Sequence, residues 1–172
     1  MQGHQLSLLL CTLSTEVPSI KRACDGAAQI VSFFRENMQA MKWLRERMTM
    51  VYGKTKPLRS FPATRFGYLY LMVRDVFDSL KACELVIMED RWRNKYKDSP
   101  KAEQLRTTLN APWFRDNLEE AVYLLSPISA ELQSIEADRA NVALVIPMWR
   151  RIFSHLLQYC TKYKRIKGMF LD

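Results

Sequence analysis

Apolar residues recur every three or four positions along most of the chain, and no segment shows a convincing alternation of apolar and polar residues. The clearest run comprises Phe66, Leu69, Val73, Val76, Phe77, Leu80, Cys83 and Ile87. This spacing places the apolar side chains on one face of a helix, whereas alternation would indicate strands. The pattern therefore predicts an all-α fold of about eight helices.

Prolines and one glycine mark the ends of the predicted helices, because proline favours the first helical turn and glycine the position after the last. The predicted helices span residues 18–37, 38–52, 64–88, 100–109, 112–125, 127–135 and 141–163. Gly53 ends the second of them, and Pro147 lies near the start of the last one or kinks it. Residues 4–13 are either a further helix or a buried strand running into one, because short apolar runs are ambiguous.

The composition supports one domain with a substantial core. The chain has 172 residues, of which 48% are apolar and only 5 are glycine. This length is enough to bury a core, and the apolar content argues against disorder. The polar patch at 93–101 is the strongest candidate for a domain boundary, and it is too weak to divide the chain. We therefore predict a single helical domain over residues 1–172.

Charge is unevenly distributed along the sequence, whose net charge is +8. Residues 42–65 carry seven basic residues against one acid, and residues 91–101 carry five against one. The tail from Arg150 adds six basic residues, whereas residues 116–138 hold six acids and no lysine or arginine. Such segregation fits a polyanionic partner, although composition alone favours a helical protein with ordinary solvated charged faces.

The sequence carries no recognisable catalytic, metal or disulfide motif. The four cysteines are widely separated and only 2 histidines accompany them, so they predict small buried side chains in a reducing compartment. The adjacent acids Glu89–Asp90 and Glu119–Glu120 point in different directions on a helix, so neither forms an acid–base pair. We expect no enzyme activity, no cofactor and no small-molecule substrate.

No apolar run approaches the roughly 20 residues of a membrane span. The apolar run at residues 6–13 lacks the preceding lysine or arginine of a secretion signal. We therefore expect an intracellular protein that is neither embedded in a membrane nor secreted.

The segment Pro62-Ala63-Thr64-Arg65-Phe66 places an unusual charge at a predicted helix start. Pro62 prevents a helix before it, and Thr64 can cap the helix that follows. Arg65 then lies in the first turn, where a cation opposes the helix dipole. Free backbone N–H groups, a guanidinium and the Phe66 ring together suit a phosphate and its base.

Several segments together resemble the hAT (hobo–Activator–Tam3) transposases. Residues 2–9, Gln-Gly-His-Gln-Leu-Ser-Leu-Leu, resemble the segment after the family's second catalytic aspartate, which typically reads Cys-x-x-His followed by Leu-Asn-Leu. Residues 28–34 resemble the next helix of the family, and residues 62–66 match its Thr-Arg-Trp or Thr-Arg-Phe signature. Residues 118–132 are similar to the helices that follow, so the resemblance covers most of the chain.

The resemblance implies a helical insertion domain that interrupts an RNase H-like catalytic core, with residues 1–13 as a remnant of the junction. In the family, three carboxylates on that core bind two divalent metals such as Mg²⁺, and the matching segments are not in this chain. It therefore implies a nuclear, transposase-derived DNA-binding domain that is catalytically incomplete. Met1 occupies the family's cysteine position, and Phe66 replaces the signature tryptophan with a smaller ring that lacks the indole N–H.

The candidate DNA-binding residues combine the resemblance with the basic segments. The resemblance places His4, Arg65 and Phe66 at the inherited site. Supporting phosphate contacts come from Lys54, Lys56, Arg59, Arg91, Arg93 and Lys95. Trp92 lies among Arg91, Arg93 and Lys95 in the sequence. This position is equally compatible with base stacking and with burial in the core. The core positions predicted from apolar neighbours are Trp43, Trp113 and Trp149.

Other functions remain open from the sequence. One is a protein-interaction or oligomerisation module, in which the acidic region 116–138 meets a basic partner or the chain binds another transposase-like protein. A second is a decayed transposase fragment without a function. An autonomous nuclease would need three convergent carboxylates and Mg²⁺, and we expect none.

Overall fold

The computed structural model describes residues 2–60, 67–137 and 144–163, and every regular element in these ranges is a helix. The eight helices of these ranges are α1 Gln2–Glu16, α2 Pro18–Glu36, α3 Met38–Tyr52, α4 Gly67–Met88, α5 Asp90–Tyr96, α6 Pro100–Asn110, α7 Pro112–Ala137 and α8 Val145–Tyr163. The predicted all-α fold is confirmed, and residues 4–13 are helical. None of these eight helices is both long enough and apolar enough to cross a membrane.

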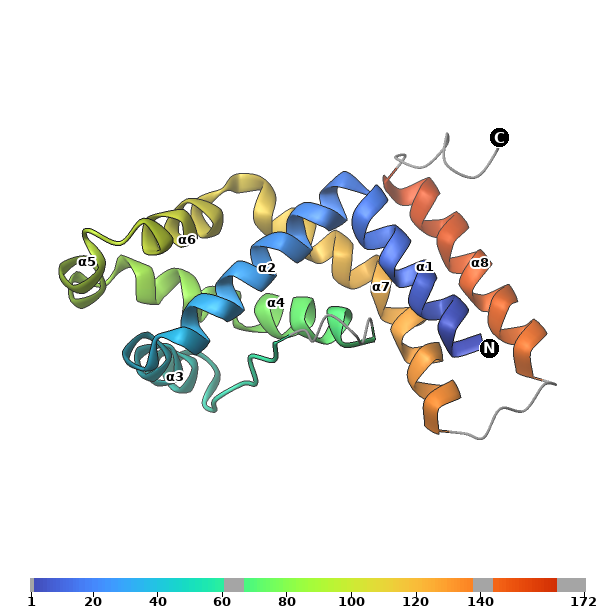
Figure 1. The fold of residues 1–172 in the computed structure, drawn as a ribbon, viewed down its shortest axis with the longest axis horizontal. Coiled ribbons are helices and arrows are strands. Elements are labelled where there is room, and N and C mark those ends of the chain that lie inside the picture. Colours follow the sequence, from blue (N-terminus) through green and yellow to red (C-terminus); the bar gives the residue numbers. More distant parts are fainter. Residues whose placement is uncertain (1, 61–66, 138–143, 164–172) are drawn as a thin grey trace.

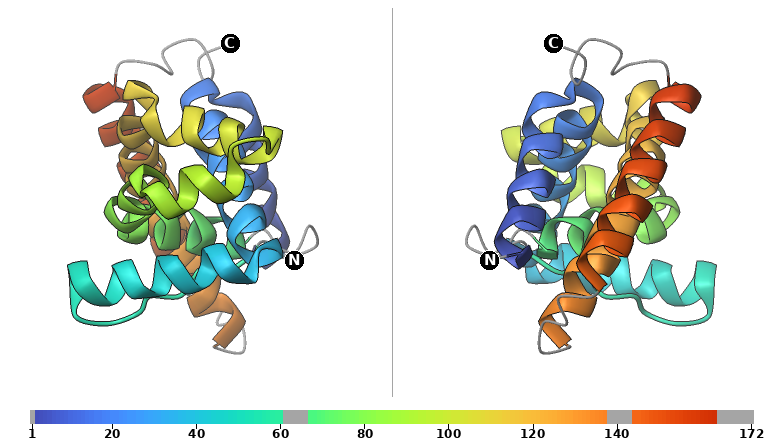
Figure 2. Two further views of the ribbon diagram at one scale, coloured as in Figure 1. Left: turned by 90° about the vertical axis from the view of Figure 1, so that its left-hand side faces the viewer. Right: turned by 90° about the vertical axis from the view of Figure 1, so that its right-hand side faces the viewer.

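The helices form an elongated molecule with three of them through its middle (Figure 1). There α2, α4 and α7 pack against one another, while α3 and α5 form one end and α1 and α8 form the other. Figure 2 views the molecule from each end, with α3 nearer the viewer in one view and α8 nearer in the other, so the two helices lie at opposite ends. Residues on α3 and residues on α8 therefore belong to separate surfaces.

The apolar stripe predicted for α4 is buried. Its buried members are Leu69, Val73, Val76, Leu80, Cys83 and Ile87, and Phe77 is half-buried against them. Burying a large apolar side chain contributes roughly 2 kcal/mol relative to leaving it in water. This stripe fixes α4, and α4 in turn supports the irregular segment 54–60.

Two turns set the position of α3. Asn37 separates α2 from α3, and its backbone N–H and its Nδ2 both donate to the Phe33 carbonyl, at 3.1 and 2.8 Å. Gly53 ends α3 with a φ of 72°, a left-handed conformation that glycine adopts without strain. The predicted helix end is thus confirmed, and the segment 54–60 that follows runs back beside α3.

Residues 112–137 form a single helix, and the predicted break at Pro127 is wrong. A proline inside a helix removes one backbone hydrogen bond and costs roughly 3 kcal/mol. Leu124, Leu125 and Ile128 beside it are fully buried, so tertiary packing outweighs that cost. The continuous α7 packs against α1, α2, α4 and α8.

Two other elements differ from the prediction. Residues 90–96 form the short helix α5, where only a polar stretch was predicted. The buried side chains of α8 are Met148, Ile152, Leu156 and Tyr159. Apolar periodicity along this helix predicts a stripe that includes Trp149, Ile152, Phe153 and Leu156; Ile152 and Leu156 are buried and Trp149 is half-buried against the core, but Phe153 is 57% exposed.

Candidate nucleic-acid interface

The residues predicted to bind DNA lie at two ends of the molecule. Arg65 and Phe66, with the rest of the 62–66 motif, lie outside the described residues. His4 is exposed in the first turn of α1, opposite the α3 end (Figure 1). The basic candidates lie on the segment 54–60 and on α5, at the α3 end. The structure therefore groups the basic candidates and separates His4 from them.

Lys56 and Arg59 attach the segment 54–60 to its neighbours. Lys56 Nζ donates to the Asp78 carbonyl at 2.7 Å and lies 3.8 Å from the centre of the Tyr52 ring. Arg59 forms a bidentate ion pair with Asp75, through Nε at 3.0 Å and Nη2 at 3.1 Å. Burial raises the pKa of Asp75, whose side chain is 5% exposed, and Arg59 counteracts part of that rise. Both cations are thus committed to contacts within the protein.

Arg91 and Arg47 converge on Glu89 between α3 and α5. The Nε atoms of both arginines donate to the Glu89 carboxylate. Arg91 also pairs with Glu46 at 2.8 Å and lies 5.0 Å from the centre of the Trp43 ring. Burial alone would raise the pKa of Glu89, but the hydrogen bonds from Arg91 and Arg47 outweigh it and lower the pKa. The cluster holds α5 on α3 and compensates the charge of Arg91.

The remaining basic candidates are more accessible. Lys54 is exposed and has no ion-pair partner in the part of the chain that the structure describes. Arg93 lies 3.9 Å from the exposed Asp90 carboxylate, and Lys95 lies 6.0 Å from the centre of the Tyr96 ring. Such contacts between exposed charged groups contribute little to the stability of the fold. Lys54, Arg93 and Lys95 are therefore free to meet a phosphate.

Trp92 lies in the core, so of the two positions that the sequence allowed, the core position is correct and the candidate base-stacking contact is not. Its side chain is 3% exposed, and its ring centroid lies 5.3 Å from that of Phe33 and 5.9 Å from that of Phe34. Tyr96, one turn further along α5, packs on it at 4.7 Å. The reason is amphipathicity: α5 turns its two rings inward and its basic residues outward.

A groove between α3 and the segment 54–60 gathers further cations that the sequence analysis did not select. It has a volume of about 1160 Å³, and its charged lining consists of Arg35, Lys42, Arg45 and Lys56 with one acid, Glu46. The groove residues of α3 recur every three or four positions between 38 and 49, which places them on one helical face. That spacing is the sequence signal that would have identified Lys42 and Arg45.

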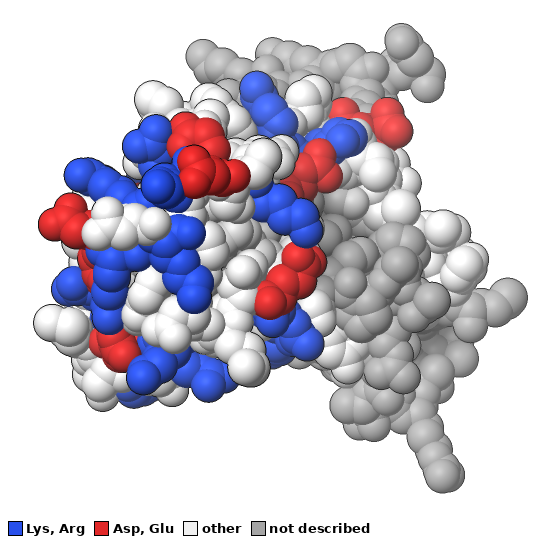
Figure 3. All heavy atoms as spheres, turned by 60° about the vertical axis from the view of Figure 1, so that its left-hand side comes forward, with Lys and Arg blue, Asp and Glu red and all other residues white. Residues whose placement is uncertain are grey.

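Lysines and arginines gather over this end of the molecule, with acids between them (Figure 3). Glu46 and Glu89 are partners of Arg91, so the surface around α5 is close to neutral. Lys42 and Arg45 have no ion-pair partner within the described ranges. The positive charge is thus concentrated at the groove.

The other tryptophans divide between core and surface. Trp43 is 8% exposed, which confirms its core position, and Trp149 is half-buried. Trp113 was predicted in the core, and this is wrong: it is 40% exposed, with the Arg22 guanidinium 5.4 Å from the ring centre. Its neighbour Phe114 takes the core position at the start of α7.

The acidic region 116–138 does not form a single exposed face. Glu120 is 3% exposed and accepts hydrogen bonds from Ser19 Oγ at 2.9 Å and from Tyr159 OH at 2.5 Å. Glu131 pairs with Arg151 of α8 at 2.6 Å. These two acids therefore join helices to one another.

Within the described residues, no three His, Cys, Asp or Glu side chains converge to hold a metal ion. All four cysteines are unpaired, and burial of Cys24 and Cys83 confirms the prediction for these two. Burial raises the pKa of each of these thiols to about 12, so both are protonated and unreactive at neutral pH.

Comparison with protein-family models, with curated proteins and with solved structures finds no match to this chain. Its function must be inferred from its own residues.

Proposed function

We propose that this protein is a transposase-derived, non-catalytic helical domain that binds DNA. The DNA would bind at the end of the molecule formed by α3, the segment 54–60 and α5, which we call the basic end. The observation that carries the proposal is the groove beside α3, where four basic side chains accompany a single acid. Phosphates dominate the affinity of proteins for DNA, and lysine and arginine are the residues that neutralise them. DNA binding of this kind implies a nuclear location.

The basic side chains differ in how available they are to bind a phosphate. Lys54, Arg93 and Lys95 are exposed cations at the same end of the molecule as the groove and supply further contacts, whereas Lys56, Arg59 and Arg91 chiefly hold the surface together. Arg65 and Phe66 lie outside the described residues, and the sequence motif and the family resemblance alone propose them as DNA contacts. His4, on α1, lies at the opposite end of the molecule from α3 and α5, so it shares no common site with the basic residues of α5.

Salt dependence tests the proposal. If about four phosphates are neutralised, raising the salt from about 50 mM to about 200 mM weakens binding on the order of a hundredfold. Filter binding at these two concentrations measures the change. Equal retention at both would remove the DNA-binding proposal. Incubation of the DNA with Mg²⁺ in the same experiment should leave it uncut, and chelator-sensitive cleavage would contradict the non-catalytic assignment.

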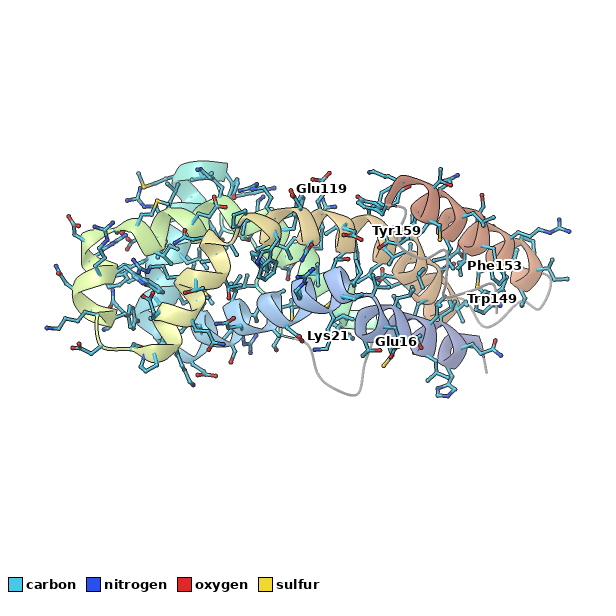
Figure 4. All side chains as sticks on the ribbon, turned by 90° about the horizontal axis from the view of Figure 1, so that it is seen from above. Glu16, Lys21, Glu119, Trp149, Phe153 and Tyr159 are labelled. Atoms are coloured by element: carbon cyan, nitrogen blue, oxygen red, sulfur yellow. The ribbon has the colours of Figure 1, made fainter. Side chains whose placement is uncertain are left out.

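A second candidate function is oligomerisation through α8. Its outward side carries Ile146, Phe153 and Leu157, which are 67%, 57% and 69% exposed. Figure 4 shows Trp149 and Phe153 side by side on this helix, with ring centroids 5.9 Å apart. An exposed apolar patch of this kind is typical of an interaction site. A dimer that forms without DNA and persists at high salt would favour this function.

A further inference from the structure

The groove beside α3 is positive because its cations have no competing carboxylate. Lys42 and Arg45 are exposed and without an acidic partner in the described part of the chain. The acid in the lining, Glu46, accepts a hydrogen bond from Arg91 at 2.8 Å, so its charge is compensated from α5. The groove therefore differs from the cluster around Glu89, where each arginine already faces a carboxylate.

The spacing of these groups suits a row of phosphates. Lys42 and Arg45 lie one turn apart on α3, Arg35 joins them from α2, and Lys56 lies on the segment across the groove. The groove face of α3 between residues 38 and 49 is about 16 Å long at the rise of an α-helix. One strand of a duplex places a phosphate about every 3.4 Å along its axis and winds away from a straight helix beside it, so Lys42 and Arg45, one turn apart, can meet neighbouring phosphates.

The lining of the groove contains no aromatic residue. The rings of α3 and α5 are covered: Tyr52 lies under Lys56, Trp43 lies under Arg91, and Trp92 is in the core. Proteins that hold single strands stack the bases on exposed rings. A groove without such rings favours a duplex, whose bases remain paired with each other.

We infer that this groove holds the phosphate backbone of duplex DNA, with Lys42 and Arg45 as its main contacts and without readout of the base sequence. The inference rests on the proposed DNA-binding function and specifies the form of DNA and the residues that meet it.

Fluorescence anisotropy with the full-length protein tests the inference. The probes are two labelled short duplexes of equal length and unrelated sequence, one of their single strands, and an RNA duplex of the same length. We expect equal affinity for the two DNA duplexes, weaker binding of the single strand, and no tighter binding of the RNA duplex. The variant Lys42→Gln/Arg45→Gln should weaken duplex binding roughly tenfold and reduce the slope of affinity against salt by about 1.8, at about 0.9 for each phosphate contact.

The control is Lys21→Gln/Lys162→Gln, which removes the same charge from the first turn of α2, where Lys21 pairs with Asp25, and from the last turn of α8. Figure 4 labels Lys21, far along α2 from α3. Both substituted side chains are exposed in each variant. The control should stay within about twofold of the wild type, because long-range charge effects are screened by salt. Circular dichroism checks the helices of each variant, and the single substitutions replace any double variant that loses helical signal.

Equal losses in the groove variant and the control would overturn the inference and leave DNA binding by overall charge intact. Tighter binding of the single strand or of the RNA, or a tenfold preference between the two DNA duplexes, would also overturn it. A wild-type protein that binds none of these probes at low salt would instead remove the proposed function.

Discussion

Glu120 of α7 joins three helices through one buried carboxylate, and it illustrates what single residues decide in this fold. Two of its donors are Ser19 on α2 and Tyr159 on α8. Burying a carboxylate without hydrogen-bond donors is strongly unfavourable. The side chain therefore specifies how α2 and α8 meet α7, in addition to their apolar contacts.

We expect Tyr159→Phe to destabilise the protein by about 1–3 kcal/mol, because it removes a buried donor to the carboxylate of Glu120. Urea unfolding followed by circular dichroism measures the loss. Tyr163→Phe is the control, since the same helix then loses a half-buried hydroxyl that donates to no carboxylate, and it should change stability by less than about 0.5 kcal/mol. Equal stability of both variants would show that Glu120 does not need the Tyr159 hydroxyl.

Glu89 makes stability depend on pH. Its pKa is lowered in the folded state, so the ionised carboxylate stabilises the fold above the unfolded-state pKa, near 4.5. That stabilisation is lost as the pH falls through the lower folded-state pKa. Glu89→Gln should therefore be less stable than the wild type at neutral pH, and the difference should shrink in acid. Glu103→Gln, which removes an exposed pair with Arg106, should show little difference at any pH. A difference for Glu89→Gln that stays constant with pH would contradict this assignment.

At the scale of elements, α2 and α7 approach each other closely at Gly26. A Cβ at this position would lie 2.5 Å from Phe114 Cε2, and Phe114 is itself only 1% exposed. We expect Gly26→Ala to destabilise by about 1–3 kcal/mol through overpacking, despite the helix preference of alanine. Gly3→Ala is the control, because its nearest atom, Leu132 Cδ1, is 3.7 Å away. Thermal unfolding compares the two, and a stabilised Gly26→Ala would contradict the close packing.

The helices could be predicted wherever the local sequence pattern, such as apolar periodicity or a helix-ending glycine, agreed with the packing of that segment against other helices. The stripe of α4 and the end of α3 at Gly53 followed directly from sequence. The local signal at Pro127 indicated a break, but the burial of the residues around it depends on contacts with other helices. On α8 the apolar residues cover more than one side, so the sequence pattern did not define which side faces the core.

At the scale of the whole molecule, the location of the basic end could be predicted from the sequence, but which of its cations are paired with carboxylates could not. The charge run 42–65 already marked it in the sequence. Arg59 pairs with Asp75, 16 residues away, and Arg91 pairs with Glu46, 45 residues away, in addition to its near neighbour Glu89. Only the fold reveals which cations are compensated, and that the segment after Gly53 returns beside α3 to close the groove.

Helix α8, which carries the exposed apolar side chains, lies at the end of the molecule opposite α3, so association and DNA binding should be separable (Figure 1). We expect the wild type to self-associate through α8, because monomers rarely leave such a group of apolar side chains in water. The variant Phe153→Ser/Leu157→Ser should be monomeric in size-exclusion chromatography with light scattering, at low and high salt alike. Its affinity for duplex DNA, measured per monomer, should stay within about twofold of that of the wild type. A wild-type dimer that places both of its grooves on one duplex would bind more tightly by avidity, and short duplexes that hold one groove avoid this effect.

The matched control for this variant is Met50→Ser/Met88→Ser, which removes two side chains that are 72% and 56% exposed and lie outside α8. It should associate like the wild type, since the loss of exposed apolar surface elsewhere leaves α8 unchanged. Association that disappears at high salt would instead assign the contact to charged groups, because apolar contacts are not weakened by screening. Association that survives in the α8 variant would place the interface on another surface, and oligomerisation through α8 would then be excluded.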